Sequence, residues 1–158
     1  MFLYIKTILL IYFTVVFSYT ILPYLSIFSA IPNIILAVAL IYIFQNNLLQ
    51  GLLWAVLGGF LYDIFGIQFP VNIFITTVLV LLAWFLAKRF FETSNIYIFA
   101  TFCFLTSFLI SFANFFALDW HFMSIACLSA FYTTLVAIII NYYFFRKKNA
   151  QKIFPILS

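Results

Sequence analysis

Residues 48–89 read LLQGLLWAVLGGFLYDIFGIQFPVNIFITTVLVLLAWFLAKR and are predominantly apolar. This stretch holds two long apolar runs separated by a short joint that contains a glycine and a proline. A helix needs about 17–25 apolar residues to cross about 30 Å of hydrocarbon. The runs are continuous and lack the period-two alternation of a membrane β-barrel. They therefore predict two membrane-spanning helices.

The rest of the chain has the same character. Its 158 residues are 68% hydrophobic and 6% charged, which leaves too little polar surface for a water-soluble domain. We expect a single transmembrane domain over residues 1–158, with the lipid bilayer as its solvent. The net charge of +4 does not indicate a nucleic-acid partner, because the basic residues do not cluster with stacking aromatics on a soluble stretch.

Polar and Pro- or Gly-containing joints divide the chain into six apolar segments. The predicted fold class is an all-α integral membrane protein, a bundle of six transmembrane helices. The predicted spans are residues 5–22, 32–44, 48–65, 70–87, 96–117 and 122–145, and a basic tail follows at 146–158.

The basic residues predict the orientation of the bundle, since cytoplasmic loops carry an excess of Lys and Arg. With six crossings, all of them fall on one side of the membrane, and an odd number of crossings would divide them. We therefore expect both termini in the cytoplasm. The residues concerned are Lys6, Lys88, Arg89, Arg146, Lys147, Lys148 and Lys152.

The second predicted span is short. Residues 32–44 cover only about 20 Å as a helix, which is less than the hydrocarbon thickness. The apolar residues Tyr24 to Ile31 have two interpretations. They continue the helix past a proline kink, or they form an interfacial or re-entrant piece that meets the span below the outer surface.

Asp63 is the only acidic residue inside a predicted span, and a carboxylate in a membrane interior usually has a partner. Counted along ideal helices, Asp63, Asn33 and Asn72 lie at a similar depth. The second and fourth spans begin at this depth beside Pro32 and Pro70, so their free N–H groups point toward Asp63. We predict a polar latch of Pro32, Asn33, Asp63 and Asn72. The alternatives are an Asp63 that snorkels to the outer headgroups and an ion or proton site.

Small residues recur in the third span at Gly51, Ala55 and Gly59, with Gly58 beside them. Such a stripe lets a neighbouring helix backbone approach closely. It indicates packing within the bundle or contact with a partner, which includes a second copy of the chain in a homodimer.

Catalytic and metal sites are not expected. His121 is the only histidine, and the chain has neither a His-Glu-x-x-His pair nor a Gly-x-Ser-x-Gly elbow. Cys103 and Cys127 would sit nearer opposite faces of the membrane, which disfavours a disulfide. We therefore predict a protein that is not an enzyme and that has no catalytic residues, metal or cofactor.

One part of the chain resembles a known family. Pro32-Asn33 opens an apolar helix, Gly51 and Gly58-Gly59 follow, and the sequence Tyr62-Asp63-Ile64-Phe65-Gly66 precedes a span that ends in Lys88-Arg89. This pattern resembles the rod-shape-determining protein MreD family. Two loops depart from the family: residues 68–70 replace its Leu-Gly, and the polar joint 45–47 lacks its frequent basic residues.

The resemblance implies a non-enzymatic scaffold of the bacterial cell-elongation machinery in the cytoplasmic (inner) membrane. Its implied partners are the bitopic protein MreC and, through MreC, the peptidoglycan synthases. The family is similar in fold to the substrate-capturing subunits of vitamin uptake transporters, and such a subunit is the alternative function. Those subunits commonly dock through an Ala-x-x-x-Ala stripe on their first helix, whereas the segment from Ile5 to Leu22 contains no alanine.

Overall fold

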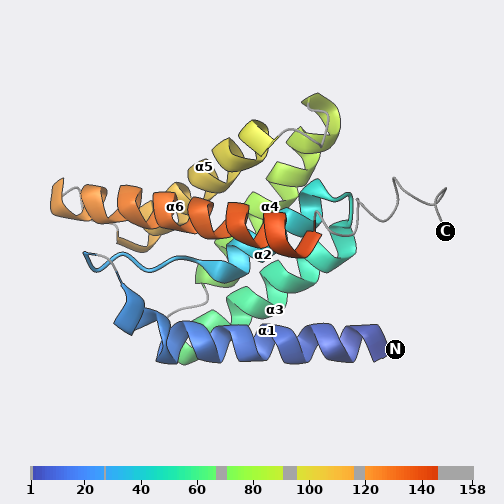
Figure 1. Cartoon of the computed structure of the whole chain (residues 1–158), viewed down its shortest axis with the longest axis horizontal. Helices are drawn as coiled ribbons and strands as arrows, with labels where there is room; N and C mark the ends of the chain where they lie inside the picture. Colours follow the sequence, from blue (N-terminus) through green and yellow to red (C-terminus); the bar gives the residue numbers. More distant parts are fainter. Residues whose placement is uncertain (1, 27, 67–70, 91–95, 116–119, 146–158) are drawn as a thin grey trace.

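The computed structural model describes residues 2–26, 28–66, 71–90, 96–115 and 120–145. All regular elements in these ranges are helical, which agrees with the predicted all-α class. Figure 1 shows long helices arranged around a short central one. The elements are α1 (Phe2–Thr20), η1 (Leu22–Leu25), α2 (Ile34–Phe44), α3 (Leu48–Gly66), α4 (Val71–Phe90), α5 (Ile96–Phe115), α6 (Trp120–Ile140) and the π-helical turn η2 (Asn141–Phe145).

Among the described residues, three helices are long and apolar enough to cross a membrane. They are Leu48–Gly66, Val71–Arg89 and Met123–Tyr143, which correspond to α3, α4 and α6 with its π-helical extension. The apolar stretches Tyr4–Thr20, Ile34–Phe44 and Ile96–Phe112 are shorter. These helices are consistent with the membrane protein that the composition predicts.

Helix α2 forms the centre of the fold. It contacts α1, α3, α4, α5 and α6, and most of its 11 residues are buried. A helix of this length covers about 17 Å, roughly half of the hydrocarbon thickness. Because α2 is apolar on all sides, it suits a position enclosed by other helices. Its buried residues are Ile35, Leu36, Ala37, Ala39, Leu40, Ile41, Ile43 and Phe44.

The chain between α1 and α2 does not continue either helix. Helix α1 ends at Thr20, two residues before the predicted end, and the 3-10 turn that follows contains Pro23. Proline has no N–H to donate and disfavours helical geometry in the residue before it. Phe28 and Ser29 then adopt positive φ angles of 50° and 66°. The interpretation of Tyr24 to Ile31 as a helix kinked at a proline is therefore wrong.

The joint between α2 and α3 is a tight turn made by Gln45, Asn46 and Asn47, where the sequence predicts a break. Asn46 has a φ of 60°, a conformation that asparagine tolerates better than most residues. The Asn47 N–H donates to the Tyr42 carbonyl oxygen at 2.9 Å, and the Asn47 side chain accepts from the Gln50 N–H at 3.4 Å. The first of these hydrogen bonds ends α2, and the second caps the start of α3.

Candidate functional site

The Asp63 carboxylate of α3 binds the first turn of α4. Its Oδ1 accepts hydrogen bonds from the backbone N–H and the side-chain Nδ2 of Asn72, both at 3.0 Å. Its Oδ2 accepts from the backbone N–H of Ile73 at 2.9 Å. Only 5% of Asp63 is exposed, so these donors replace water as the partners of the carboxylate.

This geometry explains how the chain holds a buried carboxylate. The first N–H groups of a helix have no partner within the helix, and the helix dipole favours a negative charge there. Asp63 caps α4 from a neighbouring helix, as an N-cap residue would from within its own chain segment. Both oxygens are occupied, and the side chain is enclosed. The arrangement matches a latch and not a side chain that snorkels toward headgroups.

Helices α3 and α4 approach each other closely beside the latch. A Cβ atom on Gly59 would lie 2.7 Å from the Ile73 Cα and 2.8 Å from the Thr76 Oγ1, which is closer than real Cβ atoms come. The Thr76 hydroxyl lies 2.5 Å from the Asn72 carbonyl oxygen of its own helix and 3.2 Å from the Ala55 carbonyl oxygen of α3. The glycine thus brings the N–H of Ile73 within reach of Asp63.

Two other glycines of α3, Gly51 and Gly58, face α2. A Cβ atom on Gly51 would meet the side chain of Ile43 at 2.7 Å, and one on Gly58 would overlap the side chain of Ile35. Gly51, Ala55, Gly58 and Gly59 are all buried within the chain. They therefore serve packing inside the bundle, and this stripe is not a surface open to a partner or a second copy.

Pro32 and Asn33 do not join Asp63. The Asn33 Oδ1 accepts the Leu36 N–H at 3.1 Å, so Asn33 caps its own helix α2. The Asn33 N–H donates to the Thr133 Oγ1 of α6 at 3.0 Å. The latch expected from four residues is thus two separate contacts, because α2 has its own N-cap and needs no carboxylate from α3.

The contact with α6 supports the non-helical segment before α2. Ser129 donates its hydroxyl to the Ile31 carbonyl oxygen at 2.8 Å, and Thr133, which is 0% exposed, accepts from Asn33. Irregular backbone at membrane depth is tolerated only where protein or a water-filled cavity satisfies its polar groups. Two hydroxyls of α6 thus take the place of helical hydrogen bonds around the buried Pro32.

Thr133→Val keeps the shape of the side chain but removes the acceptor of the Asn33 N–H. We expect a loss of about 1–3 kcal/mol in stability, because the N–H would be buried without a partner. Thr134→Val is the matched control, since the Thr134 hydroxyl donates within its own helix to the Ala130 carbonyl oxygen at 2.8 Å. Thermal unfolding in detergent measures both variants. Equal midpoints for the two would refute the role of Thr133.

Several contributing residues were not identified from the sequence. Thr76, Ser129 and Thr133 look like ordinary hydroxyls in apolar helices, and Tyr19 looks like an interfacial aromatic. The Tyr19 hydroxyl donates to the Tyr62 carbonyl oxygen at 2.8 Å, and its ring stacks on Phe65 with centroids 5.8 Å apart. This contact ties α1 to the end of α3 that carries Asp63. The sequence signal that could have identified these residues is the presence of hydroxyl side chains within predicted spans, since such side chains often form hydrogen bonds between membrane helices.

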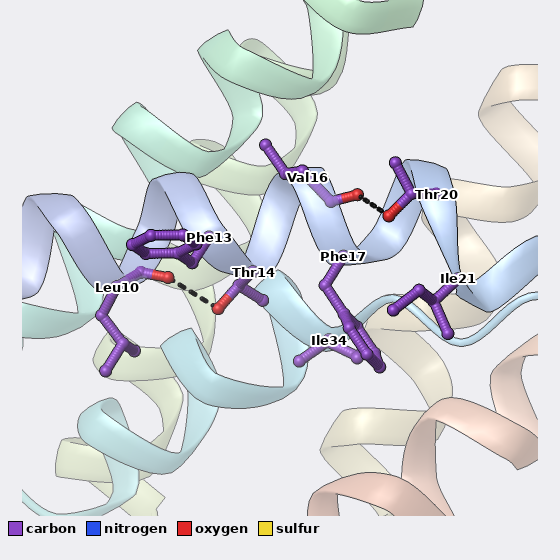
Figure 2. A pocket seen from close by; sticks show the side chains of 8 residues that line it. All are labelled: Leu10, Phe13, Thr14, Val16, Phe17, Thr20, Ile21 and Ile34. Carbon is purple, nitrogen blue, oxygen red and sulfur yellow. Dashed lines mark hydrogen bonds between the residues drawn. The ribbon is translucent and has the colours of Figure 1, made fainter.

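An apolar groove of about 490 Å³ lies along α1 beside the start of α2. Figure 2 shows its lining, with the Thr14 hydroxyl bound to the Leu10 carbonyl oxygen and the Thr20 hydroxyl bound to that of Val16, each at 2.8 Å. These hydroxyls are satisfied by their own helix. The groove therefore offers an apolar surface that suits a lipid chain or another helix better than a polar vitamin.

The described residues contain no group of three or more His, Cys, Asp or Glu side chains that could hold a metal ion. Cys103 is buried and Cys127 is exposed, and both are free thiols. Asp119 lies outside the described residues, as does the side chain of His121.

Comparison with protein-family models, with curated proteins and with solved structures finds no match.

Proposed function

We propose that this chain is a non-enzymatic scaffold of the bacterial cell-elongation machinery, of the kind that its resemblance to the MreD family implies. It would cross the cytoplasmic membrane six times with both termini inside and bind an MreC-like bitopic protein. Through that partner it would contact the peptidoglycan synthases.

The proposed six crossings are supported by helix lengths. Helix α1 has 19 residues and α5 has 20, which as whole helices are close to the roughly 30 Å of a bilayer core. Helices α1 and α5 are therefore counted as membrane crossings in addition to α3, α4 and α6. Helix α2 and the non-helical residues 30–33 before it would form one broken crossing, enclosed by the other helices.

The proposed orientation is supported by the placement of basic residues. Lys6 lies near the start of α1, and Lys88 and Arg89 lie in the last turn of α4. In Figure 1, α1 begins and α4 and α6 end toward the same side of the molecule. The remaining basic residues follow α6 in the sequence. An excess of Lys and Arg on one side is typical of a cytoplasmic face.

The observation that carries the scaffold proposal is the role of Asp63. It stands in the sequence that resembles the family, and both of its oxygens accept hydrogen bonds from α4. Gly51, Gly58 and Gly59 of the same pattern pack against α2 and α4. These residues of the pattern thus hold α2, α3 and α4 together, as expected of a structural protein.

Affinity purification of the tagged chain from its native membranes tests the proposal. We expect a one-span protein with a coiled coil and an extracytoplasmic domain to co-purify after mild cross-linking. A tagged six-span transporter from the same membranes controls for nonspecific capture. Deletion of the gene should round the cells. Normal cell shape after deletion, together with no such partner, would refute the proposal.

The alternative function is addressed with the purified chain. A substrate-capturing subunit should gain thermal stability from a vitamin, whereas a scaffold should not. A vitamin that raises the unfolding midpoint with the logarithm of its concentration above Kd would favour the transporter subunit.

A further inference from the structure

The end of α4 remote from Asp63 carries a recess of about 390 Å³, lined by Trp84, Phe85, Lys88 and Arg89. The recess takes no part in the helix contacts described above. It combines two cations with two aromatic rings on consecutive turns of one helix. Such a combination suits a ligand that has both an anionic and an apolar part.

The two cations fold back along the helix. The Lys88 Nζ lies 5.1 Å from the centroid of the Trp84 ring, and the Arg89 Cζ lies 5.7 Å from that of Phe85. Each ring stands four residues earlier, about 6 Å nearer the middle of α4. Lys and Arg near helix ends usually extend outward to the headgroups. Here the cation–π contacts hold both charges beside the apolar part of the helix.

An exposed apolar strip leads away from the recess along α4. Phe85, Leu82, Leu81 and Val78 are all exposed, and their spacing places them on one face of the helix. The strip is continuous with the recess because Phe85 belongs to both. A molecule bound by the cations could thus extend along the strip toward the middle of the membrane.

We propose that this recess is a binding site for an anionic phospholipid. Lys88 and Arg89 contact the phosphate, Trp84 and Phe85 support the two cations, and one acyl chain lies along the strip from Phe85 to Val78. Guanidinium groups can bind phosphate oxygens in a bidentate manner, and an ammonium group adds a point charge. The site requires that α4 reaches the membrane surface, and the proposed orientation places it in the cytoplasmic leaflet, where anionic lipids attract basic residues.

Native mass spectrometry of the full chain in detergent tests the site, with dioleoyl phosphatidylglycerol and dioleoyl phosphatidylcholine as probes. We expect the wild type to bind phosphatidylglycerol about 30-fold more tightly than phosphatidylcholine, as two contacting cations would provide. The variant K88Q/R89Q should lose this preference. R146Q/K147Q removes the same charge from the tail and should retain it. Equal losses in both variants, or no preference in the wild type, would overturn the proposal.

Two further arms distinguish a phospholipid site from a simple anion site. Trp84→Leu keeps the charges and should weaken phosphatidylglycerol binding several-fold, because Lys88 loses its ring. Inorganic phosphate should not displace the lipid, since phosphate cannot contact the apolar strip. Displacement by phosphate alone would overturn the lipid assignment. Cooperative unfolding without lipid establishes that the variants fold. K88Q/R89Q should leave the unfolding midpoint unchanged because both side chains are exposed, whereas Trp84→Leu should lower it modestly because Trp84 also packs against the core.

Discussion

Asp63→Leu is expected to destabilise the protein by at least about 3 kcal/mol. The substitution removes the acceptor of two backbone N–H groups and one side-chain amide, and a buried donor without a partner costs about 1–3 kcal/mol. Water cannot replace the carboxylate, because the side chain is only 5% exposed. Thermal unfolding of the purified chain in detergent measures the loss.

Two milder substitutions remove only part of the same contact and should cost less stability. Asp63→Asn keeps one oxygen but presents an NH2 group to one of the donors, so we expect a loss of about 1–2 kcal/mol. Asn72→Ala removes only the side-chain donor and should cost about 1 kcal/mol or less. The expected order of unfolding midpoints, from highest to lowest, is Asn72→Ala, then Asp63→Asn, then Asp63→Leu. Equal midpoints for the two Asp63 variants would show that the carboxylate does not cap α4.

Gly59→Val is expected to cost about 3 kcal/mol. Its Cβ would press on the backbone of Ile73, which cannot rotate away as a side chain can. The displacement would also draw the Ile73 N–H away from the Asp63 Oδ2, now 2.9 Å distant. The two sites should therefore couple, so that Gly59→Val costs less in the Asp63→Leu background than in the wild type.

Gly51 provides the matched control for this close approach. A Cβ atom there would lie 2.7 Å from the Cδ1 and 2.8 Å from the Cγ1 of Ile43, a side chain that can shift. Its nearest backbone atom would be the Ala39 carbonyl oxygen at 3.1 Å, whereas at Gly59 the Ile73 Cα would be only 2.7 Å away. Gly51→Ala should therefore destabilise the chain less than Gly59→Ala. If Gly51→Ala lowers the unfolding midpoint as much as Gly59→Ala does, the backbone contact with Ile73 is not what requires glycine.

Local sequence signals predicted the helix ends where a few neighbouring residues determine them. The polar joint 45–47 fixes the end of α2 at Phe44 and the start of α3 at Leu48, both as predicted. Asparagine accounts for both ends, through a positive φ angle and a side-chain cap. Helix α1 stopped earlier than predicted because the effect of Pro23 reaches back along the chain.

The polar contacts between helices were harder to predict from the sequence. The depth of a residue along a helix predicts its height in the bundle, and not the direction in which it points. Asp63 and Asn72 meet because a short joint makes α3 and α4 neighbours, whereas the backbone N–H of Asn33 faces α6. The partner of Asn33 is Thr133, 100 residues away in the chain, and no local pattern connects the two.

Cysteine accessibility in intact cells is the direct test of the proposed membrane arrangement. In a background with Cys103 and Cys127 replaced by alanine, single cysteines at Ser29, Asn46, Leu118 and Ser158 would be labelled with a membrane-impermeant maleimide. Ser29 and Asn46 are exposed turn residues on either side of α2. We expect Ser29→Cys and Leu118→Cys to react in intact cells, and Asn46→Cys and Ser158→Cys to react only after the membrane is opened. Labelling of Asn46→Cys or Ser158→Cys in intact cells would contradict a six-span bundle with both termini in the cytoplasm.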